Sequence, residues 1–175
     1  MFGWFRRLHQ PRPMYRPVFP PQPRRVVLAA GCRDALRAAL EPDLVKHHEG
    51  VLYLIGQTDG FTSVAVAGFR PRAQTTRGSF HVQVPAMREV VEAANGSGLQ
   101  VVGQLHTHPG PAFHSDGDEV GARIRFSGFV SIVLPDYGTR LPSFEGAAIY
   151  MYGAGERRFI ELRPADLVVL PASLP

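Results

Sequence analysis

Three histidines and two aspartates, all metal-binding types, lie within the stretch LHTHPGPAFHSDGD, residues 105–118. His106 and His108 stand two residues apart at the end of an apolar run, and Asp118 follows a Pro-Gly turn. Because successive side chains of a strand point to opposite faces, the two histidines would project from the same face. Two neutral imidazoles and one carboxylate leave the fourth tetrahedral position of zinc for water, which is the arrangement of a catalytic site. The sequence therefore predicts one Zn²⁺ ion held by His106, His108 and Asp118.

Two further residues could complete a hydrolytic site. Glu49 precedes the apolar run GVLYLIG, which is typical of a buried strand and could lie beside the histidine strand. A carboxylate there could accept the proton of the attacking water and pass it to a leaving amine. Ser115 stands three residues before Asp118 and could donate a hydrogen bond to the oxyanion of the transition state. We therefore expect Glu49 and Ser115 to be catalytic.

Other interpretations of these residues remain open. Two histidines also occur two apart by chance, and SDGD has the pattern of a helix start with Ser115 as the N-cap. His114 and Asp116 flank the predicted site and are alternative metal ligands. Glu41 is the alternative to Glu49 as the proton acceptor.

The ordered set of Glu49, HTHP at 106–109 and SDGD at 115–118 resembles the JAMM metalloprotease family, the catalytically competent JAB/MPN domains. Those proteins carry an upstream glutamate, then H-[ST]-H-P, then S-x-x-D. The resemblance covers residues 26 to about 163, although the loop between the second histidine and the serine is one residue shorter here than is usual. The segments HHEGVLYLIGQTDG and SGFVSIVLPDYG are especially similar to prokaryotic JAB proteins of ubiquitin-like conjugation systems.

The resemblance implies a single-domain α+β fold, JAB/MPN-like and cytidine deaminase-like, with a mixed β-sheet flanked by helices. It also implies a zinc-dependent peptidase or isopeptidase that cleaves after the C-terminus of a ubiquitin-like protein. Activating and conjugating enzymes of the same pathway would be further partners. Two alternatives remain: a non-catalytic module that binds a ubiquitin-like protein, and a zinc hydrolase of a small amide or of a sulfur-carrier conjugate.

Composition divides the chain of 175 residues into an extended arm rich in proline and arginine, residues 1–24, and one domain, residues 25–175. Seven of the 19 basic residues lie within residues 1–33, which carry no acid, so the rest has 12 basic and 15 acidic residues. This distribution does not favour nucleic-acid binding by the domain; binding through the arm would depend strongly on salt. The lone Cys32 excludes an internal disulfide and is expected to be buried. No segment has the length of a membrane span or a signal peptide, so we expect a cytoplasmic protein.

The apolar pattern predicts an α+β chain with a mostly antiparallel or mixed sheet. Strands are expected over residues 26–30, 50–56, 61–69, 79–84, 99–108, 128–134, 146–152 and 158–163. Helices are expected over 33–41, ended by Pro42, over 85–95, and over 118–126. In the second helix a stripe of Met87, Val90, Val91 and Ala94 should face the core. The turn-rich segments 70–80 and 135–146 are candidate walls of a substrate groove.

Overall fold

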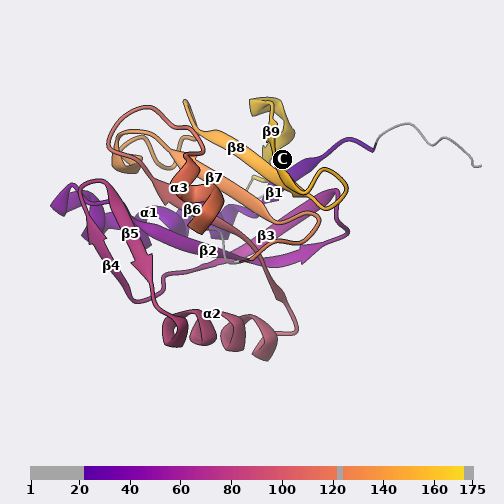
Figure 1. Ribbon diagram of the computed structural model, residues 1–175, viewed down its shortest axis with the longest axis horizontal. Helices are drawn as coiled ribbons and strands as arrows, with labels where there is room; N and C mark the ends of the chain where they lie inside the picture. The colour runs from indigo at the N-terminus through magenta and orange to yellow at the C-terminus, as the bar shows by residue number, and fades with distance from the viewer. Residues whose placement is uncertain (1–21, 122–123, 172–175) are drawn as a thin grey trace, which may run out of the picture.

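An eight-stranded mixed sheet forms the centre of the computed structural model, which describes residues 22–121 and 124–171 (Figure 1). The strand order is β10-β1-β3-β2-β6-β7-β8-β9. The β1–β3, β1–β10 and β6–β7 pairs are parallel and the other pairs are antiparallel. The strands are β1 (Arg25–Leu28), β2 (Val51–Thr58), β3 (Thr62–Phe69), β6 (Gln100–Thr107), β7 (Val130–Leu134), β8 (Ala148–Gly153), β9 (Arg158–Leu162) and β10 (Leu167–Val169). The predicted α+β class with a mixed sheet is confirmed.

Two helices cover opposite faces of this sheet. Helix α1 (Ala30–Lys46) packs Cys32, Leu36 and Leu40 against one face, in a core shared with the leucines of β2 and β6. Helix α2 (Val84–Gly96) covers the other face and buries Val90 and Ala94 against the alternate residues of β2. Side chains alternate between the two faces of each strand, so they contribute to two hydrophobic cores, and the centre of the sheet is buried on both sides. No helix in the described ranges is long and apolar enough to cross a membrane.

Helix α1 does not end at Pro42, as the sequence predicts, but continues to Lys46 with the proline inside it. A proline removes one backbone hydrogen bond, and tertiary contacts hold the next turn in place. Asp43 in that turn is buried and accepts a hydrogen bond of 2.8 Å from Arg70 Nη2. The helix stops at His47, whose φ of 53° lies in the left-handed region.

The predicted helix over 85–95 is confirmed as α2, but its buried stripe is shifted. Val90 and Ala94 are buried and Met87 packs against the core, as expected. Val91 is 40% exposed, so its assignment to the core is wrong, and Ala86 takes its place. Residues spaced by four, Ala86, Val90 and Ala94, form the line that meets the sheet.

A short hairpin stands apart from the large sheet and was predicted only in its second half. Strands β4 (Ala73–Thr76) and β5 (Ser79–Val82) pair antiparallel with each other (Figure 1). The first strand reads AQTT and the three-residue β10 is also too short for a clear alternation, so both escaped prediction. The predicted arm, residues 1–24, lies outside the described residues except for its last three.

Cys32 is 1% exposed, and burial raises the pKa of its thiol to about 11. Because the thiolate is the reactive form, we expect no labelling of the native protein by a thiol reagent at pH 8 and complete labelling after denaturation. A Ser97→Cys variant, exposed after α2, should be labelled at once and serves as the positive control. Rapid labelling of Cys32 in the native protein would contradict this packing.

Candidate metal centre

The end of β6, which carries His106 and is followed directly by His108, is held by strands on both sides. His106 lies opposite Val51 of β2 and beside Val133 of β7. His106 is fully buried and His108 is nearly so, and their ring centroids lie 5.1 Å apart. The Nε2 atoms of the two imidazoles approach to 3.2 Å. The predicted projection of both side chains from one face is thus observed.

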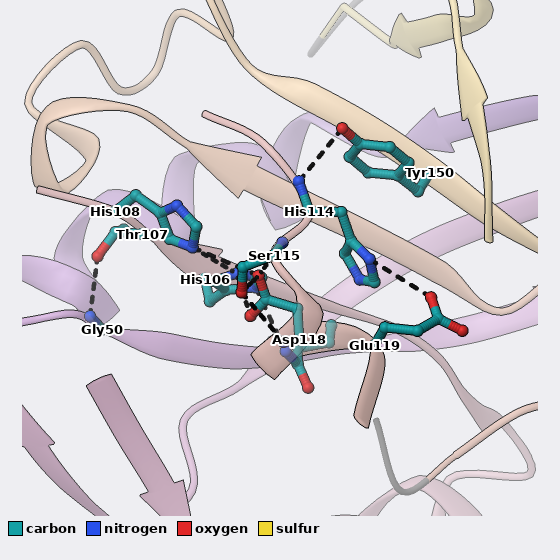
Figure 2. Close-up of polar contacts among 10 residues, drawn as sticks. Gly50, His106, Thr107, His108, His114, Ser115, Asp118, Glu119 and Tyr150 are labelled. Atoms are coloured by element: carbon teal, nitrogen blue, oxygen red, sulfur yellow. Dashed lines mark hydrogen bonds and ion pairs between the residues drawn. The ribbon is translucent and has the colours of Figure 1, made fainter. Parts of the chain in front are cut away.

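Asp118 reaches these rings from the short helix α3 (Asp116–Gly121) (Figure 2). The Asp118 N–H donates to Ser115 Oγ at 3.1 Å, and Ser115 donates from its backbone N at 2.8 Å and from Oγ at 2.7 Å to Asp118 Oδ2. These reciprocal bonds are those of a capping box, so Ser115 is the N-cap. The helix therefore starts two residues before the predicted 118–126 segment, and 124–126 are not helical.

The three side chains form a cluster with the dimensions of a tetrahedral site. Asp118 Oδ1 lies 3.1 Å from His106 Nε2, and Oδ2 lies 3.5 Å from His108 Nε2. Ligand atoms about 2.0–2.2 Å from a zinc ion at tetrahedral angles stand about 3.3 Å from each other. The separations of 3.1 and 3.2 Å around His106 Nε2 are close to that value, and the 3.5 Å separation joins His108 to the other oxygen of the same carboxylate. The spacing of these donor atoms thus fits a divalent cation with metal–ligand distances like those of zinc.

The charge of Asp118 also suits a cation. Burial by itself raises the pKa of this carboxyl, but hydrogen bonds from His106, His108 and Ser115 outweigh it. Together they hold the pKa of Asp118 far below its usual range. A largely buried, ionised carboxylate beside two imidazoles provides one negative charge for a metal ion.

Glu49 lies beside this cluster because β2 pairs with β6, as predicted. The Gly50 N–H donates to Thr107 Oγ1 at 2.9 Å, and the Thr107 N–H donates to Gly50 O at 3.1 Å. The register of Val51 with His106, continued by two residues beyond the strands, places Glu49 opposite His108, and both side chains line the same groove. The β4–β5 hairpin also contacts Glu49, since the Glu49 backbone N–H donates to Thr76 O at 2.8 Å.

Glu49 is 7% exposed, and burial raises the pKa of its carboxyl above the ordinary value for glutamate. His108 acts in the opposite direction, while the negative charge of Asp118 adds to the rise. A carboxyl whose pKa is shifted toward neutrality can both accept and release a proton near pH 7.

A groove of about 600 Å³ exposes the cluster to solvent. Glu49, His108, Ser115 and Asp118 all line it, together with residues of β5 and the loop after β6. Two aromatic rings stand against the histidines: Phe80 lies 5.3 Å from His106, and Phe113 lies 5.0 Å from His108, between ring centroids.

Only one of the two segments predicted as groove walls forms part of this groove. Residues 78–80, at the end of the 70–80 segment, line it, whereas no residue of 135–146 does. The 135–146 segment instead contacts the β4–β5 hairpin, since Tyr137 OH donates to Arg77 O at 2.9 Å. A turn-rich composition indicates a surface loop, but which groove that loop borders depends on the tertiary structure.

The alternative candidates lie outside the cluster of His106, His108 and Asp118. The ring of His114 packs against Tyr150 and Phe159. Its backbone N–H donates to the hydroxyl of Tyr150 in β8 (Figure 2). Asp116 is exposed, and Glu41 lies on the exposed side of α1 in an ion pair with Arg37.

Two polar neighbours on β6 were not predicted. Thr107 holds Gly50 as described, and Gln104 Nε2 lies 3.3 Å from His106 Nδ1. The signal available in the sequence was position alone: Gln104 is two residues before His106 and so shares its face.

Comparisons with known proteins add a functional class and a fold. No protein-family model matches the sequence. A probable metalloprotease, y4jG of Sinorhizobium fredii, is 28% identical over 135 residues, which cover 75% of this chain and 83% of that protein. The solution structure of protein DSY2949 from Desulfitobacterium hafniense superposes with a TM-score of 0.59 at 16% identity, over 83% of this chain and 92% of that one. The structural likeness shows a shared fold. The similarity to y4jG and the His-His-Asp cluster support a metal-dependent hydrolase.

Proposed function

We propose that this protein is a zinc-dependent peptidase or isopeptidase of the JAMM type that cleaves after the C-terminus of a ubiquitin-like protein. The observation that carries the proposal is the convergence of His106, His108 and Asp118 in a groove that also holds Glu49. The similarity to a probable metalloprotease supports the hydrolase class. The order of glutamate, HTHP and S-x-x-D supports the JAMM type, and the resemblance to prokaryotic JAB proteins supports the ubiquitin-like substrate.

His106, His108 and Asp118 would hold the zinc ion through two Nε2 atoms and one carboxylate. When bound, zinc supplies Lewis acidity toward a carbonyl oxygen and makes water a stronger acid. Glu49 accepts the proton of the attacking water and delivers it to the leaving nitrogen. Its raised pKa and its place opposite His108 support this role. Bound substrate above the groove would exclude bulk water from this proton transfer.

Ser115 is proposed as the donor to the oxyanion. Its hydroxyl donates to Asp118 in the structure, and the residue also lines the groove. Rotation of the hydroxyl toward substrate would leave the Ser115 N–H on Asp118, so the carboxylate keeps one of its two bonds from this residue. Ser115 can therefore donate its hydroxyl to the oxyanion while its backbone N–H continues to hold Asp118.

The substrate is proposed to bind as an extended tail along β5. This strand pairs with β4 on one side, and residues 78–82 line the groove. A tail adding to the side of β5 that pairs with no strand of the described residues would be held by backbone hydrogen bonds, which tolerate varied side chains. This route leads the tail past Phe80 to the metal cluster.

Thr107 is expected to position Glu49 through Gly50. A Thr107→Val change keeps the shape but removes the acceptor of the Gly50 N–H, which should lower the free energy of unfolding by about 1–3 kcal/mol. It should also lower kcat/KM with zinc still bound, because Glu49 is no longer held opposite His108. Urea unfolding and rate measurements at saturating zinc check both effects. Thr107→Ser retains the hydroxyl and should behave as wild type; equal behaviour of the valine variant would contradict this role.

The proposed function is tested with a ubiquitin-like protein from the same genome that carries a C-terminal extension. Wild-type protein with one zinc per chain should cleave after the tail, and chelator should stop cleavage until zinc is restored. Zinc binding without cleavage of any such protein would point to a binding module or to a hydrolase of small amides. Absence of zinc from protein purified without chelator would refute the metal site itself.

A further inference from the structure

The contacts of His106 define which of its nitrogens faces the cluster. Nε2 lies 3.1 Å from Asp118 Oδ1 and 3.2 Å from His108 Nε2, so Nε2 is the atom that would bind the metal. A neutral imidazole that gives its Nε2 lone pair to a metal carries its proton on Nδ1. His106 has no exposed surface, so this N–H cannot be satisfied by bulk water. It needs an acceptor inside the protein.

Gln104 is a side chain within reach of that nitrogen. It lies on the same face of β6, and its amide nitrogen is 3.3 Å from His106 Nδ1. An amide presents either its oxygen or its nitrogen after a half turn about its last bond. When His106 Nδ1 carries a proton, the Gln104 amide oxygen is the atom that can accept it in a hydrogen bond. The Gln104 amide nitrogen then faces the opposite direction and needs an acceptor of its own.

Ser131 lies where such an acceptor is needed, and rotation of the two side chains would bring its hydroxyl, now without a partner, to the Gln104 amide. It is the β7 residue directly beside Gln104 in the parallel pairing, so both side chains share one face. Among the buried side-chain nitrogen and oxygen atoms in the described part of the chain, its hydroxyl oxygen is the one without a hydrogen-bond partner. A buried hydroxyl without a partner in a folded protein calls for an explanation.

We propose that Gln104 is a positioning residue for the metal site, with Ser131 as its support. In the zinc-bound protein the Gln104 oxygen accepts from His106 Nδ1–H, and rotation of the Gln104 and Ser131 side chains lets the amide nitrogen donate to Ser131 Oγ. This chain fixes the tautomer and the ring angle of His106 with Nε2 directed at the metal, a role that partners of metal-binding histidines commonly have. The inference rests on the proposed metal site, but it does not depend on the identity of the substrate.

The test measures zinc affinity without substrate, by competition with a chromophoric chelator. Gln104→Leu should weaken zinc binding about 10- to 100-fold, the usual cost of losing such a partner. Gln104→Glu, which still accepts from Nδ1–H, should stay close to wild type, and Ser131→Ala should weaken binding by less than Gln104→Leu. Gln57→Leu is the matched control, because Gln57 is an exposed β2 residue whose amide bonds to Gly98 O.

A second measurement does not need a stable variant. Nitrogen-15 NMR of the zinc-bound wild type should show His106 protonated at Nδ1, with a proton that exchanges slowly with solvent. Wild-type zinc affinity in Gln104→Leu, weak binding in Gln104→Glu, or a rapidly exchanging Nδ1 proton would each overturn the inference. Failure of wild type to bind zinc would instead overturn the proposed function, so the two failures are distinct.

Discussion

Glu49→Gln is expected to lower kcat by about 100- to 10,000-fold, the range that general acid–base catalysis contributes in enzymes. Glutamine has nearly the size of glutamate but cannot accept a proton at neutral pH. Because Glu49 is not among the three side chains of the metal cluster, the variant should still bind one zinc per chain. Single-turnover cleavage and metal analysis of the same sample check both parts.

Glu41→Gln is the matched control for that change. Glu41 is a glutamate eight residues earlier, exposed on α1 and paired with Arg37, and its replacement should leave the rate unchanged. A Glu49→Gln protein that cleaves at the wild-type rate with zinc bound would exclude Glu49 as the proton acceptor. Loss of both zinc and cleavage would show that Glu49 belongs to the metal site instead.

Asp118→Asn is expected to abolish tight zinc binding and, with it, cleavage. Asparagine keeps an oxygen that can accept from the Ser115 N–H, so the start of α3 should be preserved. The change removes the only negative charge of the donor set, and zinc affinity should fall by more than the roughly 10- to 100-fold expected for a supporting residue. Isothermal titration with zinc and the cleavage assay measure the two losses.

Asp116→Asn serves as the control, since Asp116 is exposed two residues away and contributes no atom to the cluster. It should bind zinc and cleave as wild type does. Loss of zinc in Asp116→Asn with retention in Asp118→Asn would reverse the assignment of these two carboxylates. An unchanged circular dichroism spectrum in both variants would exclude unfolding as the cause.

Local features of the site could be predicted because they depend on neighbours in the chain. The two-residue spacing of His106 and His108 is enough to put both rings on one face of a strand. The three-residue spacing of Ser115 and Asp118 is enough for reciprocal capping bonds at a helix start. Helix α2 was predicted for the same reason, as a regular apolar stripe between Pro85 and Gly96.

Other features were decided by contacts between distant segments, which no local pattern encodes. Helix α1 passes Pro42 because Arg70 binds the buried Asp43 of the following turn. The three-residue β10 is a strand because β1 pairs with it. Residues 135–146 do not line the groove, and Tyr137 of this segment instead bonds to Arg77 of the β4–β5 hairpin.

The sequence by itself determined the residue types of a candidate metal site and the order in which the chain presents them. Only the tertiary structure decided which acidic residues approach the histidines, since Asp116 and Glu41 are equally acidic but face solvent. The pairing of β2 with β6 brings Glu49 opposite His108, and the start of α3 brings Asp118 to within 3.1 Å of His106. Side-chain chemistry is a property of single residues, whereas these distances follow from burying both faces of a sheet whose strands are far apart in the chain.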